Sequence, residues 1–258
     1  AHDRDSRTTS IISYTNPDSG IVMNVLDLYS TRIQKTFDED HDEIVAICKA
    51  NPKATLKLIN YYKGLLLSYP ATIAGLDRGV LDLDLQAEQA FTVEHGRYVF
   101  IRSPLFKFDL FAQAQYVNVR KKAASFVKFC YVEIMAERRN FLRLELDQPA
   151  EVRMTTPAGI LEGKLYDLSL SGLNVAVQDF CPLEPGSEVV ISFSLTDNEH
   201  QTTFSLNLPT RLISIADTER PYCYKFAMTP DKTAERQLSK FIFQRQVEII
   251  REIKDGLL

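Results

Sequence analysis

The residues with the clearest chemistry lie in two short clusters between positions 138 and 172. The first, residues 138–143, reads Arg-Arg-Asn-Phe-Leu-Arg, and the second, residues 167–172, reads Asp-Leu-Ser-Leu-Ser-Gly. Guanidinium groups bind phosphate oxygens, or the two adjacent acceptors of a guanine edge, in a bidentate geometry that lysine cannot reproduce. A carboxylate and a hydroxyl two residues apart can bind the polar groups of the base, and a glycine lets the backbone turn or a ligand lie close. The clusters therefore predict a site for a phosphate-bearing nucleotide.

Each cluster alone has a structural explanation that needs no ligand. Two arginines four residues apart are common on helix surfaces and in solvated linkers, and a string of the form Asp-x-Ser-x-x-Gly is typical of a turn. The two clusters occur together, however, and a β-rich run follows them. Their combination favours a ligand site.

The paired clusters also carry a family resemblance. Arg139-xxx-Arg143 followed by Asp167-x-Ser169-x-x-Gly172 resembles the signature of PilZ domains, which are bacterial receptors for the second messenger cyclic di-GMP. The resemblance implies that the two arginines clamp phosphate and guanine edges. It also implies that the carboxylate and the hydroxyl hydrogen-bond a guanine, and that the glycine allows a close turn.

The resemblance covers about residues 137–230 and suggests two further ligand contacts. Arg138 precedes the first motif arginine, and family members with a basic residue there tend to bind an intercalated dimer of cyclic di-GMP, so we expect two ligands per chain. Asn174 is a further candidate, although a position on the outer face of its strand explains it equally well. The chain departs from the family at residues 222–226, Tyr-Cys-Tyr-Lys-Phe, where a Gly-rich sequence ending in Phe is common.

Length and charge limit the classes of function. The 258 residues are 45% hydrophobic, enough for two small cores. A net charge of −4 argues against a general binder of nucleic acids or anionic membranes, which needs a broad basic surface. No stretch approaches the roughly 20 apolar residues that span a bilayer. The widely spaced cysteines are expected to be reduced, buried thiols of a cytoplasmic protein: Cys48, Cys130, Cys181 and Cys223.

The expected fold is mainly β with flanking helices, in two small antiparallel β-barrels in tandem, a split barrel and then a PilZ barrel. The expected divisions are residues 1–17, a polar lead; residues 18–134, a helical segment plus an N-terminal β-barrel; residues 135–143, a linker with the arginine motif; and residues 144–258, the PilZ β-barrel with a C-terminal helix.

Residues 18–64 have an apolar pattern that we interpret as helical. Stripes begin at Ile21 and Ile44, and Asn51 is expected to cap a third helix that runs to Gly64. The pair His41-Asp42 is found in metal-dependent phosphohydrolases, but the other histidines lack ligand spacing, so no metal site is expected.

From residue 65 to residue 134 the pattern changes to five or six short strands, which predict a small antiparallel barrel. In position and strand pattern this barrel resembles the N-terminal barrel of flagellar-brake-like proteins. Seven aromatic residues are expected to fill its core rather than to stack on bases: Phe91, Phe100, Phe106, Phe108, Phe111, Phe126 and Phe129.

The second barrel is expected to hold about seven short strands from residue 150 onward, with residues 204–208 and 211–215 as separate strands. Thr229 is then expected to cap a C-terminal helix, with Pro230 in its first turn. The apolar stripe of this helix favours packing on its own domain and leaves a homodimer open.

The leading functional hypothesis is a cytoplasmic cyclic di-GMP receptor that transmits its occupancy to an unidentified protein partner, such as flagellar or other motility machinery, in a motility or biofilm response. The ligand is expected to order residues 135–143 and so to change the arrangement of the domains. The alternative is a degenerate PilZ-like interaction protein that binds no nucleotide. An enzyme is not expected, because no nucleophile elbow, phosphate loop, metal cluster or pair of catalytic carboxylates is found.

Overall fold

The computed structural model describes residues 13–15, 22–24, 29–33, 38–138, 140–197, 201–216 and 220–257. It divides into two compact units. Unit 1 comprises residues 1–59, 69–86 and 93–138, and unit 2 comprises residues 60–68, 87–92 and 139–258.

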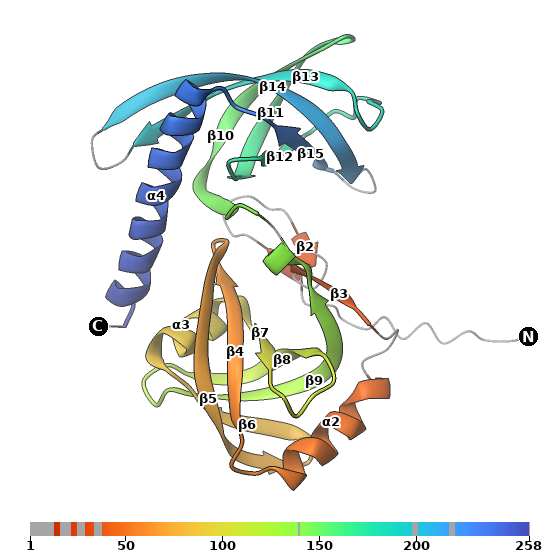
Figure 1. Ribbon diagram of the computed structural model, residues 1–258, viewed down its shortest axis with the longest axis vertical. Coiled ribbons are helices and arrows are strands. Elements are labelled where there is room, and N and C mark those ends of the chain that lie inside the picture. Colours follow the sequence, from red (N-terminus) through yellow and green to blue (C-terminus); the bar gives the residue numbers. More distant parts are fainter. Residues whose placement is uncertain are drawn as a thin grey trace, which may run out of the picture. The chain divides into compact units, whose positions relative to one another are not determined.

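Unit 1 is built on an antiparallel sheet that closes into a ring. Its strands follow the order β3-β9-β6-β5-β4-β7-β8, and β8 also pairs with β9 (Figure 1). The strands are β3 (Ser30–Arg32), β4 (Thr55–Tyr62), β5 (Leu65–Asp77), β6 (Val80–Asp84), β7 (Tyr98–Arg102), β8 (Asp109–Asn118) and β9 (Ala123–Ile134). Six of the seven aromatic residues expected in the core are buried, whereas Phe108 is exposed.

The helices near this ring are α2 (Asp38–Ala50) and α3 (Ala87–Gly96), and a separate two-stranded sheet pairs β1 (Ser13–Thr15) with β2 (Val22–Asn24). The sequence pattern did not predict α3, which has only ten residues and is followed by its C-cap, Arg97, in the left-handed conformation. A helix this short has too few turns to establish a clear apolar stripe.

The predicted third helix between Asn51 and Gly64 is wrong, because the chain forms β4 there. Leu56, Leu58 and Tyr62 are buried, a spacing that suits a strand of period two as well as a helix. The Asn51 side chain donates to the carbonyl of Ile47 at 2.9 Å and so closes the end of α2 instead of beginning a helix.

The turn after β4 explains why a strand is formed. Lys63 and Gly64 both have positive φ, 49° and 83°, which is the backbone of a two-residue hairpin. The first predicted stripe, from Ile21 onward, lies mostly outside the described residues, and the described part, Val22–Asn24, is a strand.

Unit 2 is a closed barrel with strand order β10-β11-β12-β15-β14-β13. The elements are β10 (Leu144–Thr156), β11 (Gly159–Leu168), β12 (Gly172–Val177), β13 (Glu188–Asp197), β14 (Thr202–Ala216), β15 (Tyr222–Met228) and α4 (Lys232–Asp255). Six strands form where about seven were expected, because β14 runs unbroken through Pro209, which pairs with Val190. The mainly β fold with two antiparallel closed sheets and a C-terminal helix is confirmed.

The cap of α4 differs from the prediction. Asp231, not Thr229, is the N-cap, and its carboxylate accepts a hydrogen bond from the amide of Ala234 at 2.8 Å. The helix buries one face, formed by Ala234, Leu238, Ile242, Arg245, Ile249 and Ile253.

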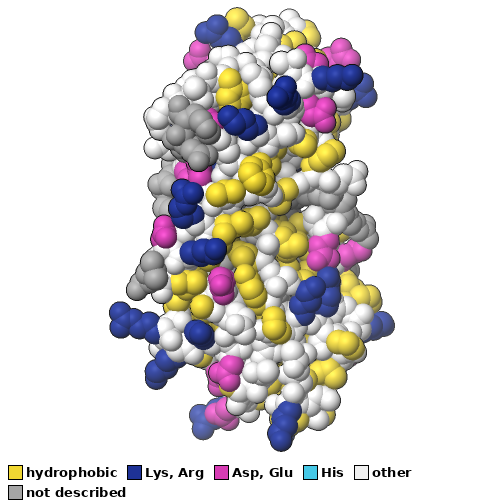
Figure 2. All heavy atoms as spheres, turned by 60° about the vertical axis from the view of Figure 1, so that its left-hand side comes forward, with side chains coloured by type: hydrophobic (Ala, Val, Ile, Leu, Met, Phe, Trp, Pro, Cys, Tyr) yellow, Lys and Arg dark blue, Asp and Glu magenta, His cyan; other side chains and the backbone are white. Residues whose placement is uncertain are grey.

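A second stripe of α4 remains exposed and consists of Phe243, Val247 and Ile250. Figure 2, which brings the α4 side of Figure 1 forward, shows apolar side chains exposed among basic and acidic ones. No helix in the described part of the chain is long and apolar enough to cross a membrane.

Candidate functional site

The second polar cluster forms the turn between β11 and β12. The amide of Ser169 donates to the carbonyl of Gly172 at 2.8 Å, and the Ser169 hydroxyl donates to the same oxygen at 3.2 Å. The amide of Ser171 donates back to the Ser169 hydroxyl at 3.3 Å. Because Ser169 is buried and its hydrogen bonds lie within the turn, its role in the structure is to stabilise the turn.

Three residues of the predicted site meet on the outer face of the barrel beside this turn. Asp167 and Asn174 are cross-strand partners on β11 and β12, and the Asn174 amide nitrogen donates to Asp167 Oδ2 at 2.6 Å. Arg143 Nε lies 3.4 Å from Asp167 Oδ1. Both Asp167 and Asn174 are 8% exposed, so these polar groups hold one another in place at the edge of solvent.

The Asn174 side chain has one group that is not satisfied. Leu173 and Val175 face the barrel core, so Asn174 points to the outer face. Its Oδ1 is buried and has no hydrogen-bond partner among the described residues. An amide that is oriented by a neighbouring carboxylate, and whose oxygen lacks a partner, is suited to contact a ligand.

Gly172 is required by two close neighbours. A Cβ at this position would lie 2.8 Å from the carbonyl oxygen of Phe226 and 3.4 Å from Arg143 Nη2. The first distance is shorter than real Cβ contacts, so any larger residue would push β12 away from β15. The missing side chain also leaves room for the Arg143 guanidinium beside the turn.

The first polar cluster is described only in part. Arg138 ends a short 3₁₀ helix, η1 (Met135–Arg138), in unit 1, and its side chain is not described. Arg139 lies outside the described residues. The structure therefore brings together Arg143, Asp167, Ser169, Gly172 and Asn174, and the roles of Arg138 and Arg139 stay predictions.

A thiol lies on the same outer face. Burial raises the pKa of Cys223, the Lys225 ammonium lowers it, and the Asp167 carboxylate raises it again. The net shift is upward, so the thiol is protonated at neutral pH and is a poor nucleophile.

The backbone that carries Arg143 is fixed by contacts that the sequence analysis missed. The amide of Glu145 donates to the carbonyl of Lys63 at 3.1 Å. Gly64 packs so closely that an added Cβ would lie 2.0 Å from the Arg143 carbonyl oxygen. In the sequence, only Gly64 indicated a turn here, and it gave no indication of the residues that the turn contacts.

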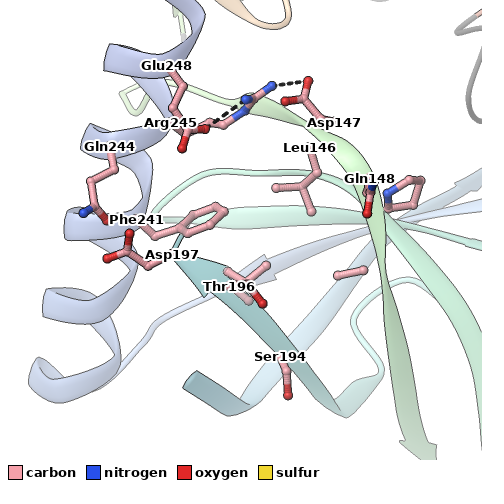
Figure 3. Close-up of a pocket in the computed structure, with 13 residues that line it drawn as sticks. Leu146, Asp147, Gln148, Ser194, Thr196, Asp197, Phe241, Gln244, Arg245 and Glu248 are labelled. Atoms are coloured by element: carbon pink, nitrogen blue, oxygen red, sulfur yellow. Dashed lines mark hydrogen bonds and ion pairs between the residues drawn. The ribbon is translucent and has the colours of Figure 1, made fainter. Parts of the chain in front are cut away.

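A cavity of about 420 Å³ lies next to the start of β10 and is lined by residues of β10, β13 and α4. Figure 3 shows Arg245 extending from α4 to Asp147 on β10, with Glu248 beside it on the helix. Arg245 is only 6% exposed, and Lys63 also bonds Asp147, at 2.7 Å. These charges pair with one another and so tie the start of β10 to α4. We call this group of paired charges the junction: Lys63, Asp147, Arg245 and Glu248.

The pKa of Asp147 reflects this pairing. Burial alone would raise the pKa, but the hydrogen bonds from Lys63 and Arg245 outweigh it and lower the pKa below its ordinary value. The pKa of Lys63 is shifted in the opposite direction, upward, because its hydrogen bonds to Asp147 and Glu252 outweigh the effect of burial, which alone would lower it.

Elsewhere in the described residues, no three His, Cys, Asp or Glu side chains cluster as metal ligands would. His41 stacks on Phe129, with ring centroids 5.5 Å apart. Asp40, from the same acidic run, accepts a hydrogen bond from the amide of Tyr131 at 2.8 Å. This region therefore has a structural explanation.

Comparison with known families decides the nature of the barrel. Residues 137–244 match the family model of the PilZ domain. This part of the chain is a PilZ domain. The match includes both polar clusters, so the resemblance seen in the motifs is confirmed.

No curated protein matches the sequence. Among solved structures, the inhibitor of motility MotI/DgrA of Bacillus subtilis is 13% identical, with 77% of this chain and 98% of that chain covered and a TM-score of 0.39. YcgR from Escherichia coli, in complex with c-di-GMP, is 21% identical, with 84% and 93% covered and a TM-score of 0.38. The MrkH–c-di-GMP complex of K. pneumonia is 12% identical, with 82% and 96% covered and a TM-score of 0.42.

Proposed function

We propose that the protein is a receptor for cyclic di-GMP. The observation that carries this proposal is the convergence of Arg143, Asp167 and Asn174 beside Gly172 on the outer face of a PilZ domain. The guanidinium is suited to the acceptors of a phosphate or guanine edge, and the carboxylate to the N–H groups of guanine. Ser169 serves the site by holding the turn that presents these groups.

Arg138 and Arg139 complete the site in this proposal. Arg139 pairs with Arg143 as a phosphate and guanine clamp, and Arg138 supports a second, intercalated ligand molecule. Because these cations lie next to each other in the chain, a multivalent anion would reduce their repulsion and order residues 135–143. The resulting change in the arrangement of the two units would then be sensed by a protein partner in a motility or biofilm response.

The first test is isothermal titration calorimetry of the full chain with cyclic di-GMP. Arg143→Ala is expected to weaken binding by at least about tenfold, since hydrogen bonds to charged groups contribute about 1.5–3 kcal/mol. Arg153→Ala is the matched control, because Arg153 is an exposed arginine on β10, the strand that begins directly after Arg143. Absence of binding to the unaltered chain would refute the receptor and favour the degenerate interaction protein. Turnover of the nucleotide would favour an enzyme.

The stoichiometry and the ordering step have separate tests. Two ligands per chain are expected, and Arg138→Ala is expected to reduce the number to one; a value of one for the unaltered chain would contradict the dimer. Small-angle scattering with and without ligand tests the change in arrangement. Identical profiles at saturation would count against it.

A further inference from the structure

Lys225 occupies a place in the site that its position in the sequence does not reveal. On β15 it is the cross-strand partner of Asn174, which in turn pairs with Asp167. Its neighbours Tyr224 and Phe226 are fully buried in the barrel core. Because side chains alternate along a strand, Lys225 points to the outer face, in one row with the other two residues.

The row places the ammonium group within reach of the site. Adjacent strands lie about 4.8 Å apart, so the Lys225 Cα is about 5 Å from that of Asn174 and about 10 Å from that of Asp167. The Lys225 ammonium lowers the pKa of the Cys223 thiol and the Asp167 carboxylate raises it, as expected for two charges on the same face as this thiol. Lys225 is exposed and forms no salt bridge with another described residue.

The distribution of charge points to an anion. On the β10 side, Arg143 already has the Asp167 carboxylate at 3.4 Å, which offsets part of its positive charge. On the β15 side, Lys225 has no such partner. A ligand seated over Asn174 and Gly172 would therefore have Arg143 on one side and an uncompensated ammonium on the other.

We propose that Lys225 binds a phosphate of the cyclic dinucleotide from the β15 side, opposite Arg143; this inference rests on the proposed function. A phosphate fits better than a base edge for a physical reason. Reading a base requires polar groups held in one orientation, as those of buried Asp167 and Asn174 are, whereas an exposed lysine is a mobile point charge that suits a phosphate.

The test is calorimetric titration of cyclic di-GMP into the full chain and four variants. Lys225→Ala is expected to bind about fivefold to tenfold more weakly and with a shallower dependence on salt, as for the loss of one partly exposed charge. Lys225→Glu should bind more weakly still, and Lys225→Arg within about twofold of the unaltered chain. Lys164→Ala is the matched control, because Lys164 lies on β11 of the same barrel and is paired with Glu151 at 3.7 Å.

Unchanged binding by Lys225→Ala, or an equal loss in Lys164→Ala, would overturn the proposal while leaving the receptor intact. Failure of the unaltered chain to bind cyclic di-GMP would overturn both. A 7-deazaguanine analogue of cyclic di-GMP lacks the N7 acceptor and keeps both phosphates, so it separates a phosphate contact from a contact to guanine N7. If Lys225→Ala weakens binding of the analogue by the same factor, N7 is not the contact and the phosphate contact is supported; if the variant has no effect on the analogue, Lys225 reads the base at N7 and the proposal is wrong.

Discussion

Gly172 links the packing of the barrel to the binding site, so Gly172→Ala tests both. The added methyl carbon would lie 2.8 Å from the Phe226 carbonyl oxygen, about 0.6 Å inside the 3.4 Å of ordinary contact. Relieving this contact requires β12 to move away from β15, at a strain typical of overpacking, about 1–3 kcal/mol. The lower entropy of the unfolded chain returns about 0.4–1 kcal/mol. We expect a net loss of about 1–2 kcal/mol in the free energy of unfolding.

The assay is urea unfolding followed by circular dichroism, with cyclic di-GMP titration of the same samples. Gly75→Ala is the matched control: Gly75 lies within β5, and its added Cβ would meet only the Asp82 side chain, at 3.5 Å. We expect Gly75→Ala to change stability by less than about 0.5 kcal/mol. Because β12 also carries Asn174, the movement of β12 away from β15 in Gly172→Ala should lower ligand affinity as well. If the two variants are equally stable and bind equally well, the argument from close approach is wrong.

Three further predictions concern the junction and the helix. Arg245→Ala should lower the free energy of unfolding by about 2–3 kcal/mol in urea, because it leaves Asp147 without one partner, whereas exposed Arg251→Ala on α4 should cost less than about 0.5 kcal/mol. The lowered pKa of Asp147 means that its stabilisation is complete above the ordinary value of 3.8 and is lost as the pH falls through the folded-state pKa. The raised pKa of Lys63 means that its stabilisation is complete below 10.5 and is lost as the pH rises through the folded-state pKa, so Lys63→Met should flatten the pH profile of stability at both ends. Asp231→Ala should cost about 1 kcal/mol in thermal or urea unfolding, as expected for an N-cap, and no loss would mean that the cap is not formed in solution.

The wrong helix near residue 55 shows where periodicity fails. Leu56, Leu58 and Tyr62 fit a helix and a strand equally well over so short a segment. The segment forms a strand because the turn that follows has positive φ and because the segment pairs with β7, where Leu58 is the cross-strand partner of Ile101. Neither the pairing nor its register can be read from the segment alone.

The site was predictable in composition but not in arrangement. Residue types and spacing indicated Arg143, Asp167 and Gly172 because guanidinium, carboxylate and glycine have distinct chemistry wherever they occur. The reason for the glycine was not predictable, since the carbonyl that requires it belongs to Phe226, more than fifty residues away. The same holds for the junction, in which Lys63 and Arg245 secure the segment after Arg143.

The sequence by itself thus indicated the barrels, through the alternation of apolar residues, and predicted the class of ligand, through the functional groups of the two clusters. Only the tertiary structure decided which residues share a row across the strands, and so placed Asn174 and Lys225 beside Asp167. The physical reason is that alternation fixes the face on which a side chain lies, whereas its neighbour on that face depends on the register between strands. Register is set by turns, bulges and close contacts among residues that are distant in the chain.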